Sequence, residues 1–393
     1  MRAAMLAVLA AIGPAVMAGA SNCAGTSTGR VPLNDLGTGH YLGAFQGGLY
    51  PGGVNTIPVM HATAGLGKAD MIVPRDGAGN PSPTGRVVLL SIGLSNTTQE
   101  FCGGSFPACQ SFSFIGQAAG SNSVNHTTLV TVDGAIGGQT PPTWDMPTDP
   151  NYDTVRNTRL APAGVTEQQV QVLWIKLADA MPTMGLPGAA ADAYTLERGL
   201  GNVVRACKAR YPNLRIVYLT SRIYAGYATS ILNPEPYAYE SGFSVKWLIE
   251  AQIAQKAGGP VDAVAGDLDY DTVAPWLVWG PYPWADGTTA RSDGLTWLCA
   301  DFNPSDGTHP NTGARRKVGA MLLQELLGSP FAAGWFVNPC PADFNQSGGA
   351  TVQDIFDFIA AWFAGNPRAD YNGTGAITLE DIFAFLAAWF AGC

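Results

Sequence analysis

Two distant segments of this chain carry residue types that together could perform acid–base and nucleophilic chemistry. One segment begins with the carboxylate of Asp306 and places an imidazole, His309, three residues later. The chain has only four histidines, and imidazole is the side chain best suited to act as a general base near pH 7. Far upstream, Ser95 follows a strongly apolar run and offers a hydroxyl group. The residue types therefore predict a serine hydrolase in which one loop carries both the base and the acid that orients it.

Each of these three residues also has an ordinary structural alternative. Ser95 could begin a helix as its N-cap, a common position for serine. Asp306 could be a turn residue, and His309 could be a surface histidine. The hydrolase interpretation requires that all three lie close together in the fold.

The elements that must position these residues are indicated by apolar runs and by helical periodicity. Four continuous apolar runs predict strands buried on both faces, at residues 87–92, 129–132, 170–175 and 214–219. Helical periodicity covers residues 195–210, 244–256 and 312–327. This alternation predicts an α/β fold, a three-layer sandwich with a mostly parallel sheet, whose active site lies at the carboxyl ends of the strands. Ser95 follows the first strand and His309 precedes the last helix, so both are expected at that edge.

Composition limits the classes of protein that fit the chain. Its 393 residues are 47% hydrophobic and only 13% charged, which favours a packed globular protein with room for more than one domain. The net charge of −9 comes without a basic stripe, which argues against nucleic acid as a partner. The acidic balance is compatible with calcium binding.

The first 20 residues have the pattern of a secretory signal peptide. A positively charged start precedes an apolar run from Ala3 to Met17, and small residues up to Ala20 supply a cleavage site. A membrane anchor is the alternative, although Gly13-Pro14 interrupts the run and the run is short for a span. We therefore expect a secreted, extracellular or periplasmic protein without a membrane span in the mature chain.

Seven cysteines follow the predicted cleavage site, and most should pair in an exported protein. Cys102 and Cys109 bracket a short loop after Ser95, whereas Cys340 and Cys393 bracket the C-terminal segment. The candidates for a third bridge, among which the sequence does not choose, are Cys23, Cys207 and Cys299.

Residues 274–300 are rich in aromatic side chains and come shortly before His309. Two interpretations are open, because such residues could form a sugar-stacking wall or could pack in the core. The aromatic residues concerned are Trp276, Trp279, Tyr282, Trp284 and Trp297.

The C-terminal segment contains an internal repeat of a polar loop followed by an apolar helix. The loops are residues 343–354 and 370–381, so the second copy begins 27 residues after the first. A loop of about 12 residues can supply most of the six to eight oxygen ligands that Ca²⁺ takes. Each loop has an uncharged hydroxyl within it and Asp at its end, and both features should weaken the binding of Ca²⁺. The alternative to a calcium site is a helical hairpin with vestigial loops. The expected ligands to two Ca²⁺ ions are Asp343, Asn345, Ser347, Asp354, Asp370, Asn372, Thr374 and Asp381.

These tandem units resemble the dockerin domain over about Cys340–Cys393. The resemblance implies a small all-α module that folds around calcium and binds a cohesin-like protein. The apolar pairs Ile355-Phe356 and Ile382-Phe383 are expected to pack the two halves together. The dense aromatic residues also allow a second interpretation, an intramolecular cap docked on the catalytic domain.

The segments around Ser95 and His309 resemble the SGNH (GDSL-like) hydrolase superfamily over about residues 86–327. Ser95-Asn96 matches the first block of that family, Gly138 falls at the oxyanion glycine of the second, and Asp306 with His309 matches the last. The resemblance implies a flavodoxin-like fold and catalysis without a cofactor. It assigns Ser95 as nucleophile, His309 as base and then acid, and Asp306 as its orienter. It also makes the backbone N–H groups of Ser95 and Gly138 oxyanion donors.

The third family block departs from the pattern. It normally supplies an asparagine side chain as an oxyanion donor, but residues 176–180 contain Asp179 and no asparagine. An ionised Asp179 would accept hydrogen bonds and would be a poor donor. The departure raises the alternative of a catalytically inactive domain.

The sequence as a whole predicts a signal peptide (1–20), an SGNH-like hydrolase domain (21–337) and a dockerin-like module (338–393). The predicted function is a secreted serine esterase that hydrolyses an ester, with acetyl groups on a polysaccharide as the expected substrate. The alternative is an inactive SGNH-like scaffold that binds a glycan and attaches through its C-terminal module. A lyase or transferase on the same fold is a third interpretation.

Overall fold

The computed structural model describes residues 20–345, 347 and 349–392. The predicted signal peptide therefore lies outside the described residues, apart from Ala20. Among the helices of the described part, none is long and apolar enough to cross a membrane.

A five-stranded parallel sheet forms the centre of the larger domain. Its strands are β3 (Val87–Gly93), β4 (Leu129–Asp133), β5 (Val170–Lys176), β6 (Ile216–Leu219) and β7 (Trp276–Trp279). They lie in the order β4-β3-β5-β6-β7, and every pairing is parallel. In chain order this is 2-1-3-4-5, the flavodoxin-like order, whose switch point falls between β3 and β5. The predicted α/β fold class is confirmed, and the sheet is entirely parallel.

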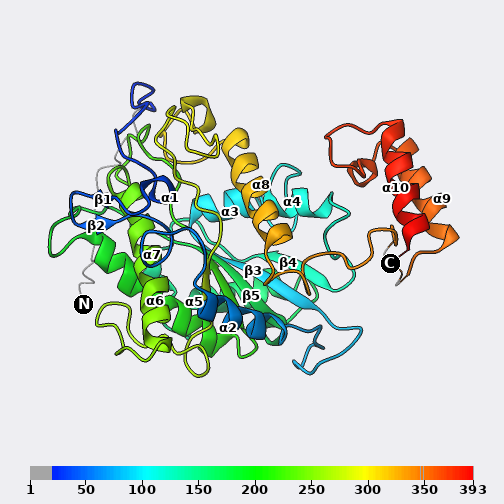
Figure 1. The fold of residues 1–393 in the computed structure, drawn as a ribbon, viewed down its shortest axis with the longest axis horizontal. Helices are drawn as coiled ribbons and strands as arrows, with labels where there is room; N and C mark the ends of the chain where they lie inside the picture. Colours follow the sequence, from blue (N-terminus) through cyan, green and yellow to red (C-terminus); the bar gives the residue numbers. More distant parts are fainter. Residues whose placement is uncertain (1–19, 346, 348, 393) are drawn as a thin grey trace, which may run out of the picture.

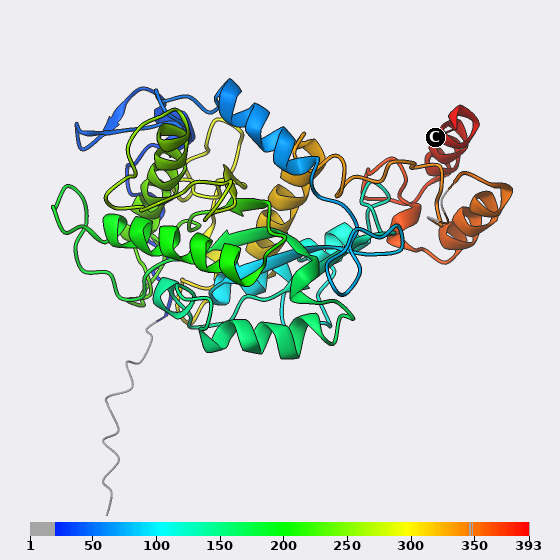
Figure 2. The ribbon, with the colours of Figure 1, turned by 90° about the horizontal axis from the view of Figure 1, so that it is seen from below.

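Helices cover both faces of this sheet (Figures 1 and 2). On one side α3 (Ser95–Phe101), α4 (Phe114–Ala119) and α8 (Thr312–Gly328) pack together. On the other side α6 (Asp192–Arg210) packs against α7 (Tyr237–Lys256). The remaining elements before the C-terminal segment are α1 (Leu33–Leu36), β1 (His40–Tyr41), β2 (Phe45–Gln46), α2 (Val59–Ala69) and α5 (Pro150–Val155), with a π turn at Arg156–Leu160 and short 3₁₀ turns at Pro141–Thr143, Glu167–Gln169 and Cys299–Asp301.

Among the elements that the sequence patterns missed, α2 and β7 pack against each other. Strand β7 was expected only as an aromatic segment, and α2 lies in a region for which no helix was predicted. Gly65 weakens the helical pattern of α2, but a Cβ there would lie 2.3 Å from the Trp276 ring. The glycine therefore permits close packing of α2 on β7 at the expense of helix propensity.

Of the two interpretations of the aromatic segment 274–300, packing in the core is confirmed and the sugar-stacking wall is wrong. Each of its five aromatic side chains is at most 5% exposed. Their indole N–H groups also find partners inside the fold: Trp276 donates to the carbonyl of His61 at 3.1 Å, and Trp297 donates to that of Pro283 at 2.8 Å. These side chains belong to the hydrophobic core, so none of them forms a wall open to a substrate.

The cysteines form two described disulfide bonds, Cys23–Cys299 and Cys102–Cys109. Cys207, the other candidate for the third bridge, is buried and carries no disulfide. Cys340 is disulfide-bonded, and its expected partner Cys393 lies outside the described residues. The first bridge ties the start of the described chain to the segment that precedes the His309 loop.

The C-terminal segment contains α9 (Val352–Phe363) and α10 (Leu379–Ala391), separated by a 3₁₀ turn at Pro367–Ala369. A small hydrophobic cluster joins the two helices, with the rings of Phe358 and Phe385 stacked at 4.3 Å. The expectation that Phe356 and Phe383 pack the halves together is wrong, since they are 64% and 69% exposed. Helical periodicity explains the difference, because Phe358 follows the buried Asp354 by one turn whereas Phe356 lies on the opposite face.

Polar contacts hold this segment against the end of the α/β domain near α4 (Figures 1 and 2). Arg368 donates from Nε to Oδ1 of Asn122 at 3.0 Å, and Asn122 donates back to the carbonyl of Arg368. A second bond from Arg368, at 2.6 Å, reaches the carbonyl of Phe344 in the first polar loop. Arg368, which lies just before the second polar loop, therefore links the first polar loop to the larger domain.

Candidate active site

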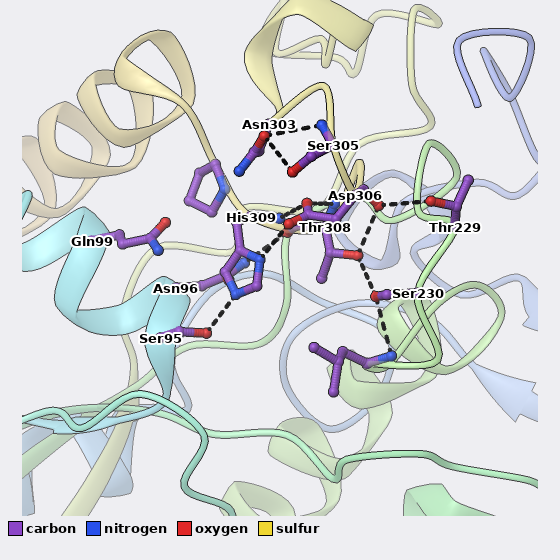
Figure 3. A network of polar contacts seen from close by, with 12 residues as sticks. Ser95, Asn96, Gln99, Thr229, Ser230, Asn303, Ser305, Asp306, Thr308 and His309 are labelled. Carbon is purple, nitrogen blue, oxygen red and sulfur yellow. Dashed lines mark hydrogen bonds and ion pairs between the residues drawn. The ribbon is translucent and has the colours of Figure 1, made fainter. Parts of the chain in front are cut away.

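The structure brings Ser95, His309 and Asp306 into one chain of hydrogen bonds (Figure 3). Ser95 Oγ lies 2.9 Å from His309 Nε2, and His309 Nδ1 lies 2.9 Å from Asp306 Oδ2. Because the Asp306 carboxylate accepts a hydrogen bond from Nδ1–H, the other ring nitrogen, Nε2, is left to accept from the serine hydroxyl. The three residues thus have the geometry in which a base activates a hydroxyl and an acid orients the base.

Ser95 occupies the first turn of α3, directly after the end of β3. It is not the N-cap of this helix, which is Leu94, so its hydroxyl is available to His309. Thr97 holds the turn by accepting from Leu94 N–H at 3.1 Å and donating to the carbonyl of Lys176 at 2.7 Å. Gly93 permits this contact, because a Cβ there would lie 2.3 Å from Thr97 Oγ1. The strand-to-helix turn is therefore anchored to β5.

The loop before α8 presents His309 and Asp306 from the opposite side of the site. Gly307 has φ +60°, and a Cβ there would lie 1.9 Å from the carbonyl oxygen of Tyr227. Asn96 Nδ2 donates to the carbonyl of Thr308 at 3.2 Å, which ties this loop to the helix that carries Ser95. The spacing between acid and base therefore depends on a tight turn that only glycine can make here.

The surroundings of Asp306 favour its ionised form. Burial acts to raise the pKa of Asp306, but hydrogen bonds from the backbone N–H groups of His309 and Thr308 and from the His309 ring outweigh it and lower the pKa. These backbone donors lie 3.0 and 2.8 Å from Oδ1, which leaves Oδ2 for the imidazole. A carboxylate fixed in this way can orient the ring and stabilise an imidazolium.

Two backbone N–H groups are available beside the Ser95 hydroxyl. A Cβ built on Gly137 would lie 3.7 Å from Ser95 Cβ, so the loop after β4 passes close to the serine. Ile136 fixes this loop by donating to the carbonyl of Gly93 at 3.1 Å. Within the described residues, neither Ser95 N–H nor Gly138 N–H has a hydrogen-bond partner. Both can therefore donate to a bound oxyanion.

A small pocket of about 80 Å³ opens beside these groups. Besides Ser95, Gly138 and His309, it is lined by Asp179, Arg222 and Asn233, together with neighbours on the same loops, and by no residue of α9 or α10. The C-terminal segment thus does not cap this pocket. Sequence reasoning missed Arg222 and Asn233, which follow β6 and carry no recognisable motif.

Asp179 occupies the loop after β5, where an asparagine was expected. Burial and, to a smaller extent, the nearby carboxylate of Asp192 raise the pKa of Asp179 to about 6. Its Oδ2 atom is buried and has no hydrogen-bond partner in the described part of the chain. Asn233 donates to the backbone carbonyl of Asp179 at 3.3 Å and so leaves the carboxyl group itself unpaired.

A buried ion pair lies beneath the site and was not predicted. Lys176 Nζ lies 2.7 and 2.6 Å from the two carboxylate oxygens of Glu100, and both side chains are fully buried. Burial lowers the pKa of Lys176 to about 8 even though Glu100 opposes the shift. The pair joins the end of β5 to α3, the helix that begins with Ser95.

The two predicted calcium loops offer oxygen donors of the kind that Ca²⁺ prefers. Asp354 is buried, accepts from Asn345 N–H at 3.0 Å and from Thr351 N–H at 2.7 Å, and is hydrogen-bonded to the Asp343 side chain. The second loop repeats this arrangement at Asp381, which accepts from Asn372 N–H at 3.1 Å. The described part of the chain has no group of three or more His, Cys, Asp or Glu side chains suited to a metal. Any Ca²⁺ bound in these loops would therefore have few charged ligands.

Comparisons with known proteins give only distant matches. No family model matches the chain, and no curated protein matches it. Three solved structures do: protein YXIM of Bacillus subtilis (14% identity, TM-score 0.31), a protein described as a GDSL-like lipase from Parabacteroides merdae (13%, 0.33) and a carbohydrate esterase family 2 enzyme with a carbohydrate binding domain from Corynascus thermopiles (Myceliophthora fergusii) (12%, 0.34). The alignments cover 63%, 65% and 65% of this chain and 58%, 97% and 69% of those chains, respectively. Matches with such low identity and TM-score carry no argument about function, so a function for this chain can be argued only from the geometry of its site.

Proposed function

We propose that this protein is a serine esterase with Ser95 as nucleophile, His309 as general base and acid, and Asp306 as the residue that orients His309. The observation that carries this proposal is the continuous chain of contacts from Ser95 Oγ through the imidazole to Asp306, with both distances at 2.9 Å. A surface histidine and an N-cap serine with purely structural roles would not be expected to form such a chain of contacts. No cofactor enters the chemistry.

The reaction has two halves. In the first, Ser95 Oγ bonds to the carbonyl carbon of the ester while its proton passes to His309 Nε2. The resulting oxyanion accepts hydrogen bonds from the N–H groups of Ser95 and Gly138. The C–O bond to the alcohol then breaks, and His309 returns the proton to the leaving oxygen. In the second half, water attacks the acyl-enzyme with His309 again taking a proton, and the acid leaves as Ser95 regains its hydrogen.

The size of the pocket favours a short acyl group. A volume of about 80 Å³ leaves room for an acetyl group but little more beside Ser95 and His309. The rim carries hydrogen-bonding side chains such as Gln139, Thr140 and Asn233, which suit a polyhydroxylated alcohol better than an alkyl chain. We therefore place acetylated carbohydrates first among the substrate classes, with simple acetate esters as convenient probes.

The direct test is hydrolysis of p-nitrophenyl acetate by the full-length protein. Ser95→Ala should reduce kcat/KM by at least about 10³-fold, because the nucleophile is lost. Ser305→Ala, which changes an exposed serine on the neighbouring loop, should leave it within about twofold. Unchanged activity in the Ser95 variant would exclude this mechanism. A folded wild type inactive on every acetate ester tested would favour the binding-protein alternative.

For the C-terminal segment we propose a secreted, calcium-binding, dockerin-like module that attaches the enzyme to a cohesin-like protein. The contact between the Asp343 and Asp354 carboxyl groups supports a bound cation, because it would otherwise bring two negative charges together. A repeated set of exposed apolar residues supports a protein partner: Phe356, Phe363, Phe383 and Phe390 are 64–79% exposed. Titration with an isolated cohesin domain should show binding that chelation of calcium abolishes, and absence of binding in saturating calcium would contradict the partner assignment.

A further inference from the structure

We propose that Asp179, in its protonated form, donates the third hydrogen bond to the oxyanion formed at Ser95. This inference rests on the proposed esterase function and concerns the same site. It also resolves the apparent conflict between an intact Ser–His–Asp chain and a carboxyl group at a position where a donor is needed.

The sheet places Asp179 on the correct side of the nucleophile. Strands β3 and β5 are neighbours, and Gly93 pairs with Lys176 at their carboxyl ends. Two residues beyond Gly93 the chain reaches Ser95, and three residues beyond Lys176 it reaches Asp179. The hydrogen bond from Thr97 to the carbonyl of Lys176 holds the two ends together. Ser95 and Asp179 consequently line the same small pocket from adjacent strands.

Three loops thus converge on the space beside Ser95 Oγ. The loop after β3 contributes the N–H of Ser95, and the loop after β4 contributes the N–H of Gly138. The loop after β5 contributes the carboxyl group of Asp179, whose buried Oδ2 has no described partner. An unpaired buried polar atom in a pocket costs free energy unless a ligand satisfies it.

The two protonation states of this carboxyl group have opposite effects on an oxyanion. A carboxylate can only accept hydrogen bonds and would repel the negative charge that develops on the carbonyl oxygen. A carboxylic acid offers an O–H donor, and an acid kept neutral in an apolar site can serve as an oxyanion donor. Two of the side-chain amides that line the pocket donate elsewhere, since Asn96 donates to the carbonyl of Thr308 and Asn233 donates to the backbone carbonyl of Asp179.

The surroundings of Asp179 favour the neutral form of its carboxyl group. Burial is the main cause, and the carboxylate of Asp192 at the start of α6 adds a repulsive charge. Asp192 is held in place by the N–H groups of Thr183 and Met184. Arg222 and His309 also line the pocket, but the Arg222 charge interacts with Glu100 and Glu235. With the pKa of Asp179 at about 6, the donor is present below that pH and is lost as the pH rises through it.

The experiment compares the pH dependence of kcat/KM for the wild type, Asp179→Asn and Asp179→Ala, with p-nitrophenyl acetate from about pH 5 to pH 8. Asparagine keeps the shape and donates at every pH, so the ratio of Asp179→Asn to wild type should rise with pH. It should start near one and reach up to about 100-fold, the usual effect of one oxyanion donor. Alanine never donates, so Asp179→Ala should be about 100-fold slower than wild type at low pH and should approach it at high pH. Ratios between variants largely remove the effects of pH on the rest of the site, because these are common to all variants.

Two results would overturn the proposal while leaving the esterase mechanism intact. One is a ratio of Asp179→Asn to wild type that does not change with pH, which would assign the third donor to a permanently charged group such as Arg222. The other is full activity of Asp179→Ala at low pH. Failure of the esterase proposal has a different signature, namely activity that survives Ser95→Ala. Thermal unfolding of each variant controls for loss of the fold. Asp192→Asn provides a second test, because it removes a negative charge that raises the pKa of Asp179, so the fall in kcat/KM with rising pH should move to lower pH.

Discussion

Loss of the ion pair beneath the active site should destabilise the protein far more than loss of an ion pair at its surface. Lys176 Nζ lies 2.6 and 2.7 Å from the two carboxylate oxygens of Glu100, and neither side chain is exposed. Lys176→Met removes the cation and leaves the Glu100 carboxyl group buried without its partner. Breaking a fully buried pair in this way costs about 3–5 kcal/mol. We expect that loss in the free energy of unfolding of the α/β domain.

The assay is urea unfolding followed by tryptophan fluorescence. With a denaturant slope of about 3 kcal/mol/M, the expected loss lowers the unfolding midpoint by about 1–1.7 M. Lys68→Met is the matched control, because Lys68 bonds Asp271 at 2.7 Å but Asp271 is 58% exposed, and such a pair contributes at most about 1 kcal/mol. The double change Lys176→Met with Glu100→Leu should recover much of the loss, since apolar groups can replace a buried pair. Equal midpoints for Lys176→Met and Lys68→Met would refute this reasoning.

Three further predictions concern the loop with the acid and base, and the calcium loops. Asp306→Asn should lower kcat for p-nitrophenyl acetate by about 10³–10⁴-fold with little change in KM, because the imidazole loses the charge that orients it; a fall below tenfold would contradict the role of Asp306. Gly307→Ala should lower both the melting temperature and kcat, because its Cβ would lie 1.9 Å from a backbone oxygen, whereas Gly294→Ala, with φ +85° and open space, should cost only about 1–2 kcal/mol. A calcium chelator should lower the unfolding temperature of the C-terminal module, because calcium at 100 times its Kd contributes about 3 kcal/mol to stability. Asp381→Ala should weaken that response, and no change with chelator would indicate vestigial loops.

Much of the fold follows from local sequence patterns. Strands β3, β5 and β6 were predictable because each is a continuous apolar run that is buried along its whole length, as parallel strands covered on both faces require. The run at β4 also predicted a strand, but the expectation of burial on both faces was wrong there, because β4 lies at the edge of the sheet and its first three residues are only half-buried. Strand β7 was not, because its Trp276 and Trp279 stand in an aromatic segment whose burial depends on α2 and on loops from distant parts of the chain. Gly65 of α2 likewise makes sense only once Trp276 is seen packed against it.

The residues of the candidate site were likewise predictable only in part. Sequence spacing identified Asp306 and His309 because both lie on one tight loop, and Ser95 because it directly follows a buried strand. The contact of Lys176 with Glu100 joins residues 76 positions apart, and the positions of Arg222 and Asn233 at the pocket depend on the sheet order. Sequence could show that Asp179 replaces an expected amide, but the burial that raises its pKa is a property of the folded pocket.

The central claim is that Ser95 is the nucleophile activated by His309, and covalent labelling tests it most directly. A fluorophosphonate ester should attach once to the folded protein, and mass spectrometry of the digested product should place the adduct on Ser95. His309→Ala should slow the labelling by about 10²–10⁴-fold, because the serine loses its base. An adduct on another residue, or labelling of Ser95 at the same rate without His309, would contradict the account.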